Sequence, residues 1–325
     1  MKKWSLFTLV LSLLFVLAAC GTNSDKDSNT NGATGTDADK PATEETTPVS
    51  IKHELDEEEV VFEKTPEKVV VFDFGVLDTL DELNIPVAGL PQATIPQYLE
   101  KYKSDEYENL GSLKEPDFEA IHAMQPDVIF ISARQSDLYE EFKKIAPTVY
   151  MGVDYTNYMD SFTSNMETIG KLFGKEDEVK AELAEVNASI EEIKEQAAAK
   201  DEKTLIIMGN EEKVSAYGPS SRFGIIHDVF GFKPADVNIE KSTHGQSISF
   251  EYVMEQNPDI LFVIDRDSAF DANASVKNAI ENDIVKKTNA YKNGKIVYLN
   301  GGPWYLAGGG LQSIKIMIED VKAGL

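Results

Sequence analysis

Arginine is rare in this chain, and its three positions are the first candidates for a binding site. The 31 basic residues include only Arg134, Arg222 and Arg266 as arginines, and the rest are lysine. A guanidinium group presents a planar set of donors that suits oxygen anions, which a lysine ammonium cannot reproduce. Arg134 and Arg266 each follow a predicted strand, and ligands of open α/β sheets bind beyond the carboxyl ends of the strands. Any one arginine could instead form a structural ion pair, because carboxylates are abundant.

Two loop segments carry other side chains that suit a ligand. Residues 243–247 contain His244, and the glycine-rich residues 301–310 contain Trp304 and Tyr305 after another predicted strand. An aromatic pair in a glycine-rich loop can flank a planar ligand, although either ring could instead belong to the core. The glycine cluster is not a phosphate-binding signature, because it matches neither GxGxxG nor GxxxxGK[ST].

An internal repeat links two of the arginines. Residues 117–134 align without gaps on residues 249–266, and Phe, Glu, Pro, Asp, Phe and Arg recur in register. Each copy predicts a helix capped by Asp117 or Ser249, a Pro-Asp turn and a buried strand that delivers an arginine. Chance similarity between two such units would explain the apolar matches but not the paired glutamate and arginine. The repeat therefore favours two arginines facing one cleft.

The elements that position these residues follow an α/β pattern. Short β-branched runs alternate with amphipathic segments, which is typical of βα units with parallel sheets. The predicted strands cover residues 69–72, 87–89, 128–131, 149–151, 205–208, 214–217, 260–264 and 296–299. Between the halves, apolar residues at alternating spacings of four and three predict one amphipathic helix over 175–200, with too few heptads for a coiled coil.

The sequence thus predicts an α/β fold of two lobes, each with a mainly parallel sheet. One long backbone helix, 175–200, joins the N-terminal lobe, 51–174, to the C-terminal lobe, 201–325, and a ligand cleft lies between the lobes.

The first fifty residues have the features of an exported, anchored protein. A positive start and an apolar run indicate a signal peptide over 1–19. The residues around Cys20, the only cysteine, resemble a lipobox, in which cleavage leaves a lipid-bearing N-terminal cysteine. An ordinary secretory signal that ends in cysteine is the alternative. Residues 20–50 predict a lipidated, disordered tether on the outer face of the cytoplasmic membrane, of the kind found in a Gram-positive envelope.

Composition excludes several other classes. With 56 acidic against 31 basic residues the formal net charge is −25, so nucleic acid is not an expected partner. A single cysteine precludes an intrachain disulfide, and the four histidines include no pair at metal-ligand spacing. The chain has neither the GxSxG elbow nor the nucleophilic cysteine that would indicate a hydrolase. A Ser-His-Asp triad assembled from distant parts of the chain is not excluded by the sequence.

Across essentially its whole length the chain resembles a known family. The family is the class III (cluster A-II) substrate-binding lipoproteins of iron-siderophore ABC importers, with the closest likeness to petrobactin-binding and enterobactin-binding types. The resemblance implies two α/β lobes, one connecting helix and little lobe movement. The matching segments are VVFDFG (70–75), GSLKEPD (111–117), ISARQ (131–135), GPSSRFG (218–224), IHDVFG (226–231), STHG (242–245), VIDR (263–266) and WYL (304–306).

The resemblance also assigns roles to residues. It implies that the three arginines surround an anionic ferric catecholate, with Gln135 and Trp304 among the ligand contacts. His244 and Tyr305 match a pair that can ligate Fe(III) where a tetradentate siderophore leaves two sites open, and a phenolate oxygen is a hard donor suited to Fe(III). Glu119 and Glu251 match carboxylates that dock each lobe onto permease arginines, although both could be merely solvated helix residues.

The function implied is that of an extracytoplasmic lipoprotein which binds a ferric catecholate siderophore, petrobactin-like, and delivers it to an ABC importer permease and its ATPase. No intrinsic cofactor, no enzymatic activity and a monomeric state are expected. A haem or cobalamin binder of the same fold is the main alternative, and a surface-anchored hydrolase is the remote one. The residues do not separate petrobactin from other catecholate siderophores.

Overall fold

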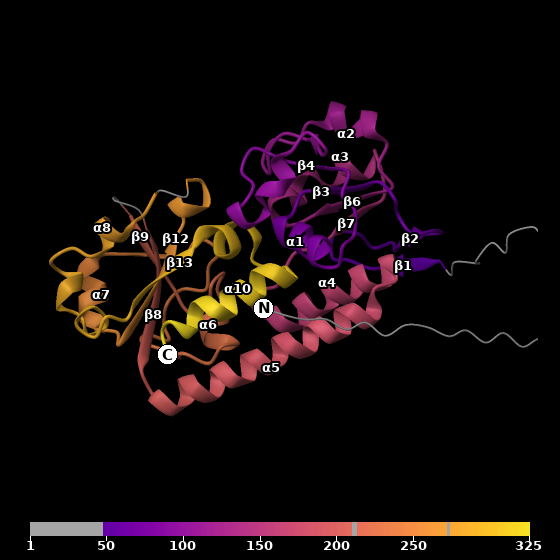
Figure 1. The fold of residues 1–325 in the computed structure, drawn as a ribbon. Coiled ribbons are helices and arrows are strands. Elements are labelled where there is room, and N and C mark those ends of the chain that lie inside the picture. The colour runs from indigo at the N-terminus through magenta and orange to yellow at the C-terminus, as the bar shows by residue number, and fades with distance from the viewer. Residues whose placement is uncertain (1–47, 210–212, 272–273) are drawn as a thin grey trace, which may run out of the picture. The chain divides into compact units, whose positions relative to one another are not determined.

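The computed structural model describes residues 48–209, 213–271 and 274–325 of the chain (Figure 1). The predicted signal peptide, Cys20 and nearly all of the predicted tether lie outside these residues. Val49 and Ser50, which the sequence places in the tether, form part of strand β1 (Val49–Ile51) and pair with β2 (Val60–Phe62) in an antiparallel hairpin. The ordered chain therefore begins slightly earlier than predicted.

The N-terminal half contains a five-stranded sheet in which every pairing is parallel, in the order β5-β4-β3-β6-β7. Its β3 and β6 strands consist of β-branched and aromatic residues and are buried throughout, as expected for a sheet covered on both faces. The elements are β3 (Val69–Val71), α1 (Phe74–Glu82), β4 (Gly89–Leu90), η1 (Gln97–Lys103), β5 (Glu108–Asn109), α2 (Phe118–Met124), β6 (Val128–Ile131), η2 (Ala133–Leu138), α3 (Tyr139–Lys143), β7 (Thr148–Tyr150) and α4 (Tyr158–Phe173).

The C-terminal half contains a second sheet, which is mainly parallel as predicted but includes one antiparallel strand. Its order is β11-β9-β8-β12-β13 with β10 beside β8, and β9 runs antiparallel to both of its neighbours, β8 and β11. The connection from β8 to β9 is too short for a parallel crossover, which needs about a dozen residues. The elements are β8 (Lys203–Gly209), β9 (Val214–Tyr217), α6 (Ile225–Asp228), β10 (Lys233–Pro234), β11 (Gln246–Ile248), α7 (Phe250–Gln256), β12 (Ile260–Asp265), η3 (Asp267–Ala269), α8 (Lys277–Ile280), η4 (Val285–Lys287), α9 (Asn289–Lys292), β13 (Ile296–Asn300), η5 (Gly302–Ala307) and α10 (Leu311–Lys322).

One long helix, α5 (Glu176–Lys200), connects the two halves where the sequence predicts it. It leads from α4 to the start of β8 and packs against α4 and α10 (Figure 1). Its buried residues are those whose alternating spacing predicted the helix: Val179, Leu183, Val186, Ile190 and Ile193. The two-lobe α/β fold class is therefore confirmed.

The internal repeat forms two matching helix–strand units, as predicted. Asp117 caps α2 by accepting a hydrogen bond from the backbone N–H of Ala120, and Ser249 caps α7 in the same way. The repeated Pro-Asp turns also match, because Asp127 accepts a backbone hydrogen bond from Lys68 and Asp259 accepts one from Lys203. The strand that follows each helix occupies the equivalent place in its own sheet, since β6 lies between β3 and β7 and β12 lies between β8 and β13.

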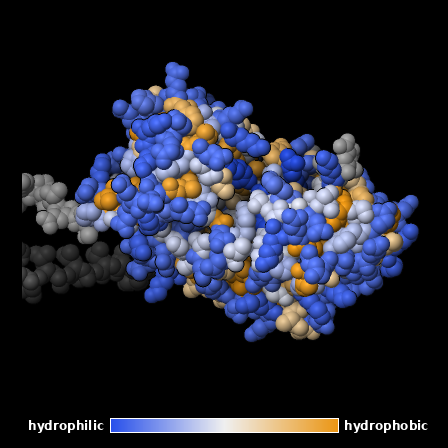
Figure 2. Space-filling model, turned by 180° about the vertical axis from the view of Figure 1, so that it is seen from behind, coloured by the Kyte–Doolittle hydropathy of each residue, from blue (hydrophilic) through white to orange (hydrophobic). Residues whose placement is uncertain are grey.

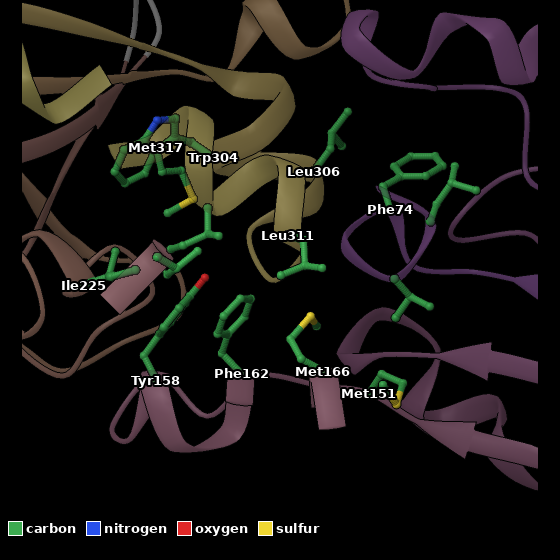
Figure 3. Close-up of a cluster of buried hydrophobic side chains, with 14 of the residues drawn as sticks. Phe74, Met151, Tyr158, Phe162, Met166, Ile225, Trp304, Leu306, Leu311 and Met317 are labelled. Atoms are coloured by element: carbon green, nitrogen blue, oxygen red, sulfur yellow. The ribbon is translucent and has the colours of Figure 1, made fainter. Parts of the chain in front are cut away.

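The main hydrophobic core includes residues from both halves. It joins α1, α4 and α10 with the segment that contains Trp304 and Leu306 (Figure 3), and the buried face of α5 belongs to the same core. Two smaller clusters lie one in each half. On the outside, the face in Figure 2 is mainly hydrophilic, with hydrophobic residues in small separate patches.

A buried carboxylate joins α1 of the first half to the N-terminus of α10 in the second. Asp78 is fully buried and accepts hydrogen bonds from the hydroxyl of Tyr98 at 2.9 Å and from the backbone N–H groups of Gln312 and Ser313 at 3.1 and 3.0 Å. A Cβ on Gly310 would lie 1.9 Å from Asp78 Oδ1, so this approach requires glycine. Side chains of α1 thus cap α10, directly after the segment that carries Tyr305.

Among the described residues, no helix is long and apolar enough to cross a membrane.

Candidate ligand-binding cleft

Two arginines from different halves of the chain hold one backbone carbonyl. Arg134, in η2 just after β6, donates to the carbonyl oxygen of Tyr305 at 2.7 Å and to that of Leu306 at 3.3 Å. Arg222, in the loop between β9 and α6, donates to the same oxygen of Tyr305 at 2.7 Å. Tyr305 lies in η5, which directly follows β13. These contacts fix the position of the η5 backbone.

The ring of Tyr305 lies close to the second and third arginines. The guanidinium carbon of Arg222 is 4.4 Å from the ring centroid, and that of Arg266, directly after β12, is 5.4 Å from it. Both distances are within the range of a cation–π interaction. The structure therefore brings all three predicted arginines to one tyrosine.

The charges of Arg134 and Arg222 are only weakly compensated. Within the described residues neither guanidinium forms an ion pair with a carboxylate, so these two arginines are not the structural ion pairs that the sequence left open. Burial lowers the pKa of Arg134, and the charge of Arg222 lowers it further, while Asp73 acts in the opposite direction. Arginine stays protonated despite such shifts, so the site holds unneutralised positive charge.

Asp73 is a carboxylate whose charge acts on Arg134, and the sequence analysis did not identify it. It caps α1, is buried, and lines the cleft. Burial raises its pKa, while hydrogen bonds and the charge of Arg134 oppose that shift. Because Asp73 follows β3, the rule that selected Arg134 could also have found it.

A cavity of about 320 Å³ lies against the arginines. Its lining residues are Asp73, Lys114, Ser132, Ala133, Arg134, Met151, Gly152, Val153, Tyr155, Arg222, Thr243, His244, Trp304, Tyr305, Ala307, Gly308 and Gly309. They come from both halves of the chain, as a cleft between lobes requires. Arg266 is exposed and contacts the Tyr305 ring without lining this cavity.

His244 reaches the same cavity as Tyr305 from the loop before β11. Its backbone carbonyl accepts a hydrogen bond from the hydroxyl of Tyr217 at 3.0 Å. Gly245 follows with a φ of +75°, and a Cβ there would lie 2.7 Å from Cζ of Tyr217. Glycine is therefore needed for the turn that holds His244. The imidazole itself is exposed.

Two residues predicted to contact the ligand also have structural roles, and Trp304 lines the cavity as well. The indole of Trp304 packs in the main core (Figure 3), and its Nε1 donates to Asp320 at 2.9 Å. Gln135 is fully buried: its Oε1 accepts from the backbone N–H of Ser132, and its Nε2 donates to the carbonyl of Leu113 at 2.6 Å. Gln135 is thus half of a capping box that orients the turn carrying Arg134.

The two repeat glutamates lie outside the cleft. Glu119 and Glu251 occupy equivalent exposed positions in the first turns of α2 and α7. Neither forms an ion pair within the part of the chain that the structure describes. Their carboxylates are therefore free to meet a partner.

A two-lobe α/β chain with a charged cleft between its halves is the architecture of a substrate-binding protein. Residues 69–301 match the periplasmic binding protein family, and the chain belongs to that family. It is accordingly a substrate-binding protein and not an enzyme.

Similarity to individual proteins extends over the full chain. The chain is 51% identical to the petrobactin-binding protein YclQ of Bacillus subtilis, over 100% of this chain and 99% of that protein. The crystal structure of YclQ matches with a TM-score of 0.83 at 54% identity, covering 86% of this chain and 99% of the other. The catecholate-siderophore binding protein VctP of Vibrio cholerae matches with a TM-score of 0.80 at 36% identity, covering 85% and 100%.

Proposed function

We propose that this protein binds a ferric catecholate siderophore of the petrobactin type and delivers it to the permease of an ABC importer. The observation that carries the proposal is the convergence of Arg134, Arg222 and Arg266 on Tyr305 at a cleft in a strongly acidic chain. A tricatecholate complex of Fe(III) carries about three negative charges, which three guanidinium groups would neutralise. The names of YclQ and VctP support the same ligand class.

Within the cleft we assign iron contact to His244 and Tyr305. Both line the cavity beside Arg134 and Arg222, and imidazole and phenolate are acceptable donors to Fe(III). They act when a tetradentate siderophore leaves two coordination positions open. A haem-binding protein of this fold would need an apolar cleft. The charged residues that line the present cavity favour a more anionic ligand than haem.

The remaining assignments concern the lobes, their docking on the permease and the attachment of the protein to the membrane. Residues 51–174 and 201–325 act as lobes joined by the helix over 175–200, and Glu119 and Glu251 dock one lobe each onto the permease. A lipid on Cys20 anchors a monomer to the outer face of the cytoplasmic membrane, in an envelope of the Gram-positive type. The equivalent exposed positions of the two glutamates support the docking role.

Fluorescence titration tests the ligand assignment. Removal of the signal peptide takes Trp4 with it, so Trp304, next to Tyr305, is the remaining tryptophan. We expect saturable quenching at submicromolar concentrations by ferric petrobactin and ferric enterobactin, and none by a ferric hydroxamate or haem. Binding of haem or the hydroxamate without binding of either catecholate would overturn the proposal.

A further inference from the structure

The cleft does not end at the arginines but continues into a second chamber of about 410 Å³. The two chambers share five lining residues: Gly152, Val153, Tyr155, Arg222 and Thr243. The second chamber is completed by Glu54, Tyr150, Asp154, Thr156, Ser161, Ser220, Ser221, Lys241 and Ser242. A ligand bound at the arginines can therefore extend into it.

Size indicates that a siderophore would use both chambers. Pockets for ligands of drug size span roughly 300–1,000 Å³, so each chamber alone is at the lower end of that range. The iron-binding groups carry the negative charge and belong beside Arg134 and Arg222. The linkers between these groups then occupy the second chamber.

The chemistry of the second chamber differs from that of the first. Its wall from the N-terminal half contributes the carboxylates of Glu54 and Asp154. Asp154 is engaged locally, because its Oδ1 accepts hydrogen bonds from the backbone N–H and the hydroxyl of Thr156 at 2.8 and 2.7 Å. Glu54 is exposed to the chamber, forms no ion pair among the described residues, and has the phenol of Tyr150 as its neighbour.

The position of Glu54 is fixed by the residue before it. His53 is 9% exposed, packs edge-on against Tyr139 and has its Nε2 3.2 Å from the carbonyl oxygen of Thr148. The preceding strand β1 pairs with β2. Because the carboxylate is already held in position, binding of a cation there requires no loss of loop conformational entropy.

We propose that the second chamber binds the siderophore linker and that Glu54 pairs with a protonated amine in it. This inference rests on the proposed function and names the side chain that recognises an amine-bearing linker. A partly exposed ion pair supports a change of about twofold to fivefold in affinity. Lys241, which lines the same chamber from the C-terminal half, would repel the same amine.

The test compares two ligands whose linkers differ in charge, and the matched variants separate that charge from the added bulk of the acetyl groups. Ferric petrobactin, whose linkers carry secondary amines, and the same complex with those amines acetylated are titrated into wild type, Glu54→Gln, Lys241→Gln and the control Glu59→Gln. Glu59 is exposed on the same loop and lines neither chamber. Calorimetry gives each dissociation constant.

We expect Glu54→Gln to weaken the amine ligand about twofold to fivefold and to leave the acetylated ligand unchanged. Lys241→Gln should not weaken the amine ligand, and Glu59→Gln should alter neither constant. Equal effects of Glu54→Gln on both ligands, or no effect on either, would overturn the inference while leaving the proposed function intact. If wild type bound neither complex, the proposed function itself would be overturned.

Discussion

Replacement of Arg134 by alanine removes the guanidinium that both holds η5 and faces the ligand. The side chain is half-buried and uses two N–H groups for the carbonyls of Tyr305 and Leu306, which leaves others for a ligand oxygen. A hydrogen bond to a charged group contributes about 1.5–3 kcal/mol, which is about a tenfold to hundredfold change in affinity. We expect Arg134→Ala to weaken ferric petrobactin binding by that factor in the fluorescence titration.

Two further variants make this measurement decisive. Arg134→Lys keeps the charge without the planar set of donors, so its affinity should fall between those of wild type and Arg134→Ala. Lys171→Ala removes an exposed charge on α4, away from the cleft cavity, and should change affinity by less than about twofold. Equal effects of Arg134→Ala and Lys171→Ala would refute the charge argument. Thermal unfolding of each variant checks that the fold survives.

Two other predictions concern docking and pH. The double variant Glu119→Ala, Glu251→Ala should keep wild-type siderophore affinity but abolish uptake of radiolabelled ferric siderophore by cells, and a loss of affinity would contradict the separation of docking from capture. Burial raises the pKa of Asp78 from 3.8 to about 7, so the folded protein keeps a proton that the unfolded chain loses. The stability from this group is therefore present below about pH 4 and is lost as the pH rises toward 7. Over that range urea denaturation should show wild type losing stability relative to Asp78→Asn, and parallel pH profiles would refute this.

Sequence reasoning succeeded where a residue's type and spacing determine its local geometry. The alternating spacing of apolar residues in α5 requires one buried helical face, whatever that face packs against. The caps Asp117 and Ser249 likewise act within their own helices. Arg134 and Arg266 were located because the carboxyl ends of parallel strands lie at one edge of a sheet, which is a property of topology.

Side-chain direction and long-range pairing are what sequence reasoning could not predict. Trp304 and Tyr305 are adjacent, yet one ring packs in the core and the other meets the arginines, because neighbouring residues of a helical segment point in different directions. For Gln135 a signal was available, since Ser132 three residues earlier completes a capping-box pattern. The short strands β10 and β11 carry little local signal, and the tertiary structure selects them.

The binding charge and the binding geometry of this cleft depend on the same side chains. Arg134 from one half and Arg222 from the other both donate to the carbonyl oxygen of Tyr305, so the η5 segment is held in place from both sides. The α1–α10 contact through Asp78 then fixes the helix that follows. An anion that enters meets donors already oriented, and little binding energy is spent on ordering them. Preorganised donors are the effective way to bind an anion within a strongly acidic protein. Their attraction acts at short range and outweighs the repulsion from a distant negative surface that salt screens.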